Sequence, residues 1–224
     1  MMDATITRLQ QKSVVTQVPK KKSYFVAKRC LDVVASGSVL LVLLPVFLMI
    51  ALVVYLDDPA GNPFFYQTRV GRNGKHFRFY KFRTMVVNAE QLLEQLQSQN
   101  EKDGPVFKME HDPRITRVGK FLRKTSLDEL PQLWNVFKGD MSLVGPRPAL
   151  PREVAQYNDY HAQRLTVTPG LTCYWQAKKQ RDSIGFEEWM ELDMQYIQAV
   201  SYTHLIWRIL GIDGPVFCAN QKRP

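Results

Sequence analysis

The chain has 224 residues, 45% of them hydrophobic, with a formal net charge of +9 and an isoelectric point near 9.5. This length is enough for one globular domain with a sizeable core, and the positive charge suits an anionic partner: nucleic acid, phospholipid headgroups or a phosphorylated substrate. Cys30, Cys173 and Cys218 are widely spaced without a C-x-x-C pattern, so neither a disulfide framework nor a zinc site is indicated, which fits a reducing cytoplasm.

Residues 1–22 are polar and predict a flexible leader, whereas an uncharged apolar stretch follows from Val33 to Leu56. A hydrocarbon core of about 30 Å is crossed by about 20 helical residues, so this stretch predicts insertion into a bilayer. Pro45 lies in its middle, and a proline in a helix interior removes one hydrogen bond and clashes with the preceding turn. We therefore expect the helix to bend or break at Pro45.

The topology of this segment follows from its flanks, which are basic on both sides. Lysine and arginine are enriched on cytoplasmic flanks, so a single span would place one basic cluster on the opposite side. Two interpretations stay open: a kinked span, which is the commoner solution for this length, and a re-entrant hairpin with both ends on the cytoplasmic side. In either case the basic flanks would hold the following domain flat on an anionic membrane surface.

Residues 64–85 predict a β-hairpin, because aromatic and β-branched residues flank the turn signal Asn73-Gly74. The interleaved basic and aromatic residues of this hairpin fit either a nucleic-acid surface or a face at a membrane interface. Helices are predicted over residues 86–101, 115–124, 128–137, 153–165 and 186–197, and the apolar segment 203–216 is expected against the membrane or the core. These elements predict an α+β fold that is mainly helical with a small β-hairpin.

Two adjacent carboxylates, Asp128 and Glu129, stand shortly before Pro131. A structural interpretation is available, because Ser126-x-x-Glu129 matches a capping box and acidic residues are stabilised near a helix N-terminus. A helix that began at Ser126 would, however, need the N–H that Pro131 lacks. We therefore expect the helix to start nearer Leu130, with both carboxylates just before its N-terminus, where a phosphate would also bind.

The sequence around this acidic pair is rich in cations. The planar guanidinium of arginine can donate two hydrogen bonds to phosphate oxygens, so these arginines could bind a diphosphate. Nearby positive charge also keeps a carboxylate ionised, which a nucleophile or a metal ligand must be. The alternative is that these are solvated surface cations in ordinary ion pairs. The cations are Lys108, Arg114, Arg117, Lys120, Arg123, Lys124 and Arg147.

Four motifs carry a resemblance to a known family: KRCLDVV, YQTRVGRNGKHFRFYKFRTM, DPRITRVGKFLRKTSLDELPQLWNVFKGDMSLVGPRP and TPGLT-x-x-WQ. From about residue 24 to its end the chain resembles the bacterial sugar transferases, which are monotopic polyprenyl-phosphate phosphoglycosyl transferases that initiate capsule, exopolysaccharide and O-antigen synthesis. The resemblance implies transfer of a sugar 1-phosphate from a UDP-sugar to undecaprenyl phosphate, with Mg²⁺ as cofactor, a covalent aspartyl phosphosugar intermediate and UMP as product.

The resemblance also implies where the protein acts and how it is divided. Residues 23–58 would be a membrane-inserted, re-entrant helix-break-helix, and residues 59–224 the catalytic phosphoglycosyl transferase domain. This domain would lie on the cytoplasmic face of the bacterial inner membrane, in contact with phospholipid. A homodimer is one expected state, and no nucleic-acid partner is expected.

Individual roles follow from the same resemblance. Asp128 falls on the family's nucleophile, and Glu129 on the partner that assists metal binding or deprotonation of the incoming lipid phosphate, so both are candidate metal ligands. Arg147 falls in the Pro-Arg-Pro motif and is implied to contact the nucleotide-sugar phosphates. The other basic positions that match the family, assigned here to phosphate, are Lys81, Arg83, Arg114 and Arg123.

The sequence departs from the family in two places. The break at Leu44-Pro45 stands where relatives have Ser-Pro, so no serine hydroxyl bonds the freed carbonyl, and the run after Gln176 lacks the glycine common in relatives, which leaves the sugar unassigned. Because many relatives carry several N-terminal spans and an extra domain, we expect this chain to be a minimal catalytic form. Two other functions stay open: a non-enzymatic basic membrane adaptor that binds anionic lipid, and a metal-dependent glycosyltransferase that releases UDP.

Overall fold

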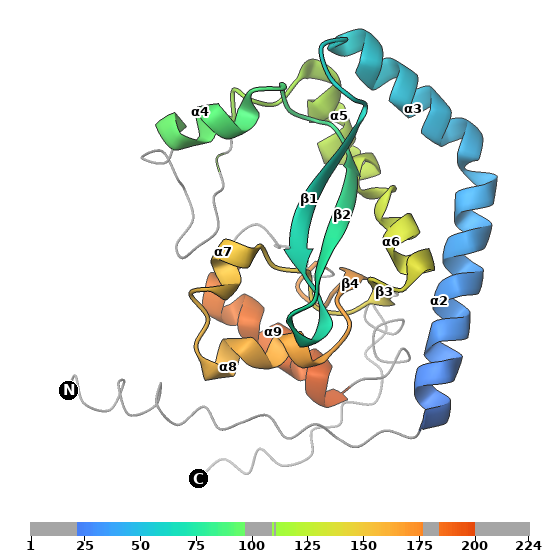
Figure 1. The fold of residues 1–224 in the computed structure, drawn as a ribbon, viewed down its shortest axis with the longest axis vertical. Coiled ribbons are helices and arrows are strands. Elements are labelled where there is room, and N and C mark those ends of the chain that lie inside the picture. Colours follow the sequence, from blue (N-terminus) through green and yellow to red (C-terminus); the bar gives the residue numbers. More distant parts are fainter. Residues whose placement is uncertain (1–21, 97–108, 110, 177–183, 200–224) are drawn as a thin grey trace.

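The computed structural model describes residues 22–96, 109, 111–176 and 184–199. Two long helices, α2 (Lys22–Val42) and α3 (Leu44–Asp57), form a bent pair along one side of the molecule (Figure 1). Among the described residues, neither helix alone has the length and apolar character to cross a bilayer, whereas the pair, bent by 62°, passes this test together. The predicted segment 203–216 lies outside the described residues.

The break between α2 and α3 falls at Leu43, so Pro45 occupies the first turn of α3 rather than a helix interior. This is the position that proline tolerates best, because the first helical N–H groups have no intrahelical partner. The predicted break at Pro45 is therefore confirmed. Apolar side chains on both sides of the break are exposed: Val39, Leu41, Val42, Leu44, Leu48 and Met49.

Polar contacts join α2 to the rest of the fold along its first half. Arg29 donates hydrogen bonds of 2.7 Å to the carbonyls of Val136 and Phe137, at the C-terminal end of helix α6 (Gln132–Lys138). The buried carboxylate of Asp32 accepts a hydrogen bond of 3.0 Å from the N–H of Leu143. These contacts dock α2 directly on the domain, so the bent pair is a fixed part of the fold rather than a tether.

The predicted hairpin is confirmed. Strands β1 (Phe64–Val70) and β2 (His76–Phe82) pair antiparallel from Phe64↔Phe82 to Val70↔His76. The turn η1 (Arg72–Gly74) places Asn73 and Gly74 at φ of 56° and 77°, which is the left-handed conformation that this dipeptide favours. The hairpin packs on α3 and on helix α5 (Arg117–Thr125) through one hydrophobic cluster, whose buried members are Ile50, Val54, Phe82 and Leu122.

The helices after the hairpin agree with prediction in three of the five cases. Helix α5 (Arg117–Thr125) is capped by the hydroxyl of Thr116, α6 is closed by Gly139 at φ of 97°, and α9 (Phe186–Ala199) covers the predicted segment 186–197. Helix α4 (Ala89–Leu96) accounts for the described part of the predicted segment 86–101.

The predicted helix over residues 153–165 is wrong. The chain there forms α7 (Pro151–Val154), α8 (Asp159–Ala162) and η4 (Gln163–Thr166). The side chain of Asn158 accepts a hydrogen bond from the N–H of His161 and starts a new helix, because asparagine competes with the helical backbone for its own hydrogen bonds. The broken path brings Tyr157 and Arg164 next to each other, with 2.6 Å between the hydroxyl and a guanidinium nitrogen.

A second sheet was not predicted. Strands β3 (Ser142–Val144) and β4 (Gly170–Thr172) pair in parallel, and the chain between them carries the Pro-Arg-Pro turn. A Cβ atom on Gly170 would lie 2.0 Å from the backbone nitrogen of Gly145, so only glycine permits this approach. Strands of three residues leave no periodic pattern in a sequence, which explains why the pairing was missed.

Candidate active site

The acidic pair lies in a single 3₁₀ turn, η3 (Leu127–Glu129), between α5 and α6. The capping-box interpretation is wrong, since Ser126 has a left-handed backbone with φ of 57° and its side chain makes no cap hydrogen bond. Helix α6 begins at Gln132, with Pro131 as its N-cap residue, so the chain enters the helix slightly later than the predicted Leu130. The carboxylates therefore stand before the helix, and Asp128 is 6% exposed.

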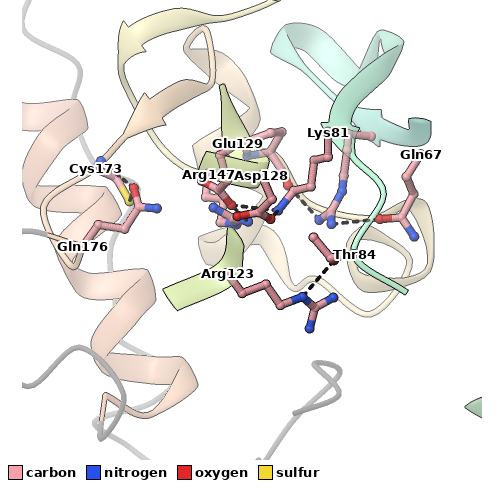
Figure 2. Close-up of polar contacts among 11 residues, drawn as sticks. Gln67, Lys81, Thr84, Arg123, Asp128, Glu129, Arg147, Cys173 and Gln176 are labelled. Carbon is pink, nitrogen blue, oxygen red and sulfur yellow. Dashed lines mark hydrogen bonds and ion pairs between the residues drawn. The ribbon is translucent and has the colours of Figure 1, made fainter. Parts of the chain in front are cut away.

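Two cations from distant parts of the chain point at these carboxylates (Figure 2). The Lys81 ammonium, from β2, lies 2.7 Å from Glu129 Oε1 and 3.5 Å from Asp128 Oδ2. The Arg147 guanidinium, from the Pro-Arg-Pro turn, donates a hydrogen bond of 2.9 Å to Glu129 Oε1. Residues 81, 128, 129 and 147 thus form one cluster of alternating charge, called here the acid–base cluster.

The electrostatics of this cluster fix Glu129 in its ionised form. Burial raises the pKa of Glu129, but the charges of Arg147 and Lys81 and their hydrogen bonds outweigh it, so the pKa lies well below its ordinary value. Burial and the nearby Arg147 lower the pKa of Lys81, and Glu129 and Asp128 oppose this shift. For Arg147, burial is outweighed by Glu129, and the pKa is raised. A carboxylate held this way is a weak base.

Buried contacts hold Lys81 in place from α6. The side chain of Asn135, which is fully buried, accepts a hydrogen bond of 3.1 Å from the N–H of Tyr80 and donates one of 2.7 Å to the carbonyl of Arg78. These bonds join α6 to β2 immediately before Lys81. Sequence reasoning missed Asn135, because an asparagine inside a short helix gives no local sign of a partner about fifty residues away in the chain.

The other predicted phosphate-binding cations have different surroundings. Arg123, on α5, donates a hydrogen bond of 2.9 Å from Nε to the hydroxyl of Thr84, and its charge interacts with Asp128 (Figure 2). Arg123 is therefore one of the positively charged residues around the acidic pair.

Arg83 and Arg114 are instead buried and paired with carboxylates of the fold. Arg83 donates to the carbonyl of Asp58 and lies 3.2 Å from its carboxylate, which holds the chain just after α3. Arg114 binds the carboxylate of Asp112 through two nitrogens, at 2.9 and 2.7 Å. Both arginines are more than nine-tenths buried, so their assignment to a substrate phosphate stays a prediction that must compete with these contacts.

The acidic pair has a donor set that suits Mg²⁺. Mg²⁺ prefers hard oxygen ligands and is often held by one or two carboxylates together with substrate phosphates. One oxygen each of Asp128 and Glu129 already converges on a single cation, the Lys81 ammonium. In the part of the chain that the structure describes, no group of three or more His, Cys, Asp or Glu side chains could form a metal site without a substrate.

Comparisons with known proteins agree on one family. The family model described as bacterial sugar transferase matches residues 23–211. The chain is 48% identical to the galactosyl transferase CpsE of Streptococcus agalactiae over 202 residues, which cover 89% of this chain and 44% of that protein. It is 42% identical to the undecaprenyl-phosphate galactose phosphotransferase of Salmonella typhimurium over 192 residues, which cover 83% of this chain and 39% of that protein.

A shorter relative matches over most of its own length. The exopolysaccharide production protein ExoY of Rhizobium meliloti is 40% identical over 176 residues, which cover 77% of both chains. The chain thus spans less than half of the two longer relatives and about three quarters of ExoY. The family model covers most of the described residues, including the whole acid–base cluster. The chain belongs to the bacterial sugar transferase family.

Proposed function

We propose that this protein transfers a sugar 1-phosphate from a UDP-sugar to undecaprenyl phosphate, as the first membrane step of exopolysaccharide, capsule or O-antigen assembly. The observation that carries the proposal is the acid–base cluster: a buried carboxylate, Asp128, beside Lys81, with Arg147 bonded to the neighbouring Glu129. Phosphoryl transfer depends mainly on positioning and charge neutralisation, which such a cluster supplies. The names of the relatives from S. agalactiae and S. typhimurium support a galactose donor as the first substrate to test.

Asp128 is the proposed nucleophile. Its carboxylate oxygen forms a bond to the β-phosphorus of the UDP-sugar, and the bond from that phosphorus to the bridging oxygen breaks, so UMP leaves with the electron pair. A phosphate oxygen of undecaprenyl phosphate then attacks the same phosphorus and displaces the Asp128 carboxylate. Two successive displacements let a soluble donor and a lipid acceptor use one site in turn.

The cations and Glu129 have supporting roles in this scheme. Lys81 and Arg147 would neutralise the diphosphate, and the planar Arg147 fork matches two phosphate oxygens at once. Glu129, whose pKa lies far below neutrality, is better suited to hold these two cations than to remove a proton. Asp128 and Glu129 together would hold Mg²⁺, which would neutralise charge on the phosphates.

The bent helix pair would place this cluster at the membrane surface. We propose that α2 and α3 are re-entrant and that the domain contacts phospholipid on the cytoplasmic face of the bacterial inner membrane. The supporting observations are the bend of 62°, the exposed apolar side chains on both sides of it, and the polar contacts that dock the first half of α2 on the domain. The homodimer remains a prediction.

Cysteine labelling in intact cells tests this topology. A re-entrant pair keeps both flanks inside, so cysteines introduced at Gln10 and Phe65 are both expected to resist a membrane-impermeant maleimide and to react after permeabilisation. The parent chain, labelled in parallel, reports the background from its own cysteines. Labelling of either introduced site in intact cells would mean that the pair crosses the membrane.

Product analysis tests the proposed reaction. Purified protein in detergent or nanodiscs is incubated with UDP-galactose, Mg²⁺ and undecaprenyl phosphate, and the nucleotide products are separated. UMP is the expected product, together with a lipid-linked sugar diphosphate. UDP as product would instead favour a glycosyltransferase that moves the sugar alone. If a panel of UDP-sugars gave no nucleotide product while salt-sensitive binding to anionic vesicles persisted, the protein would be an adaptor.

A further inference from the structure

A buried arginine, Arg164, contacts the backbone of the turn that carries Arg147. Arg164 lies in η4 and is 3% exposed. One guanidinium nitrogen, Nη2, donates to the carbonyl of Arg147 at 2.7 Å and lies 2.8 Å from Asp193 Oδ2, while Nη1 donates to the hydroxyl of Tyr157 at 2.6 Å. Asp193 lies on α9 and Tyr157 lies between α7 and α8. The Arg164 side chain therefore joins η4, α9 and the segment around Tyr157 to the Pro-Arg-Pro turn.

The turn is held from outside through its carbonyls. Pro146 and Pro148 have no N–H, so the turn cannot brace itself with ordinary backbone hydrogen bonds. The carbonyls of residues 146, 147 and 148 each accept a hydrogen bond from another element. The donors are the N–H of Gly170, the Arg164 guanidinium and the Arg69 guanidinium, at 2.9, 2.7 and 3.1 Å.

The surroundings of Arg164 fix its own direction. Asp193 is 1% exposed and supplies the opposite charge; burial raises its pKa to about 6, and Arg164 opposes the shift, so the pair is ionised at neutral pH. The rings of Trp189 and Tyr157 lie 5.2 and 5.8 Å from the guanidinium carbon. A buried cation with three polar partners and two ring faces has little freedom to move.

We propose that Arg164 is a positioning residue: by holding the Arg147 carbonyl, it directs the Arg147 guanidinium at Glu129 and, under the proposed function on which this inference rests, at the diphosphate of the nucleotide sugar. Arg147 is long, so a small rotation of its backbone displaces its charged end considerably. A misplacement of about 1 Å in a reacting complex can cost about a hundredfold in rate.

A double-mutant cycle separates positioning from simple structural support. The variants are Arg164→Lys, Arg147→Ala and the combination, and the readout is kcat/KM for radiolabelled UDP-galactose, measured as UMP release. In the parent background, Arg164→Lys keeps the charge but cannot bond all three partners, so we expect a loss of about tenfold. In the Arg147→Ala background we expect almost no further loss, because the side chain that Arg164 directs is gone.

The controls use the same chemistry elsewhere in the same region. Arg152→Lys, on an exposed residue of α7, is expected to leave kcat/KM unchanged. Tyr157→Phe removes one hydrogen-bond acceptor of Arg164 and leaves its ion pair with Asp193, so this variant replaces Arg164→Lys in the cycle if Arg164→Lys fails to fold. We expect Tyr157→Phe to lower kcat/KM about threefold in the parent background and to have almost no effect in the Arg147→Ala background. Equal losses in both backgrounds would overturn the inference.

The wild-type reaction is measured first, so that the two proposals can fail separately. If the wild-type protein releases UMP and the cycle is additive, the positioning role is wrong and the proposed function stands. If the wild-type protein releases no UMP from any UDP-sugar of the panel, the proposed function fails, and the same cycle is read on the dissociation constant for a UDP-sugar of that panel. If the effects of the two substitutions on this dissociation constant are non-additive, the positioning role is supported. If these effects are additive, or if no binding is detected, the positioning role is overturned.

Discussion

Replacing Asp128 with asparagine is expected to lower kcat for UMP release by about 10⁴-fold, since removal of a covalent nucleophile leaves only binding and charge stabilisation. The amide has the shape of the carboxylate but cannot displace UMP. The substitution removes the weaker, 3.5 Å ion pair with Lys81 and leaves the 2.7 Å ion pair of Lys81 with Glu129. The fold should therefore persist, which thermal unfolding of the purified variant would check.

The matched control is Asp159→Asn, the same chemical change on an exposed residue of α8. Because an exposed carboxylate contributes little, its kcat should stay within about twofold of the parent. Undiminished UMP release by Asp128→Asn, with Asp159→Asn equally active, would refute the nucleophile assignment.

Replacing Arg147 with alanine has the second largest expected effect, a loss of about 10²- to 10³-fold in kcat/KM for the UDP-sugar. Arg147 is the cation that bonds Glu129 from the Pro-Arg-Pro turn, and its loss removes a donor to the diphosphate and leaves Glu129 with Lys81 as its remaining partner. Initial rates over a range of UDP-galactose concentrations would measure the loss.

Arg147→Lys keeps the charge without the planar fork, so its kcat/KM should lie between those of the parent and of the alanine variant. Arg152→Ala, at an exposed residue of α7, is the control for removal of an arginine in this region. An Arg147→Ala variant with the kinetic constants of the parent would show that this arginine does not meet the donor.

Local signals in the sequence predicted the local parts of the fold. The Asn73-Gly74 turn acts through its immediate neighbours, and the hairpin follows from it. The break at Pro45 is of the same kind. The pairing of β3 with β4 was not predictable, because its register depends on a close approach of Gly145 and Gly170 that only tertiary packing produces.

The same division holds for the candidate site. Asp128, Glu129, Arg147 and Lys81 were predicted from the motifs in which they lie, and the structure brings all four together. Arg83 and Arg114 match the same kind of motif position yet hold carboxylates of the fold, at Asp58 and Asp112, because a motif position does not reveal which partner a cation faces.

Residues that act through other residues gave the weakest sequence signal. Asn135 contacts backbone groups of Arg78 and Tyr80, which are 57 and 55 residues away in the chain, and Arg164 contacts the backbone of Arg147, which is 17 residues away. Backbone partners leave no residue type to match, so such contacts become visible only in three dimensions.

The central claim is that the Asp128 carboxylate forms a transient covalent bond to phosphorus. The most direct test is peptide mapping by mass spectrometry, after rapid acid quenching of the protein with UDP-galactose and Mg²⁺ in the absence of undecaprenyl phosphate. The account predicts a sugar-phosphate adduct on the peptide that contains Asp128, which disappears when undecaprenyl phosphate is added before the quench. Release of UMP without any adduct on that peptide would contradict it.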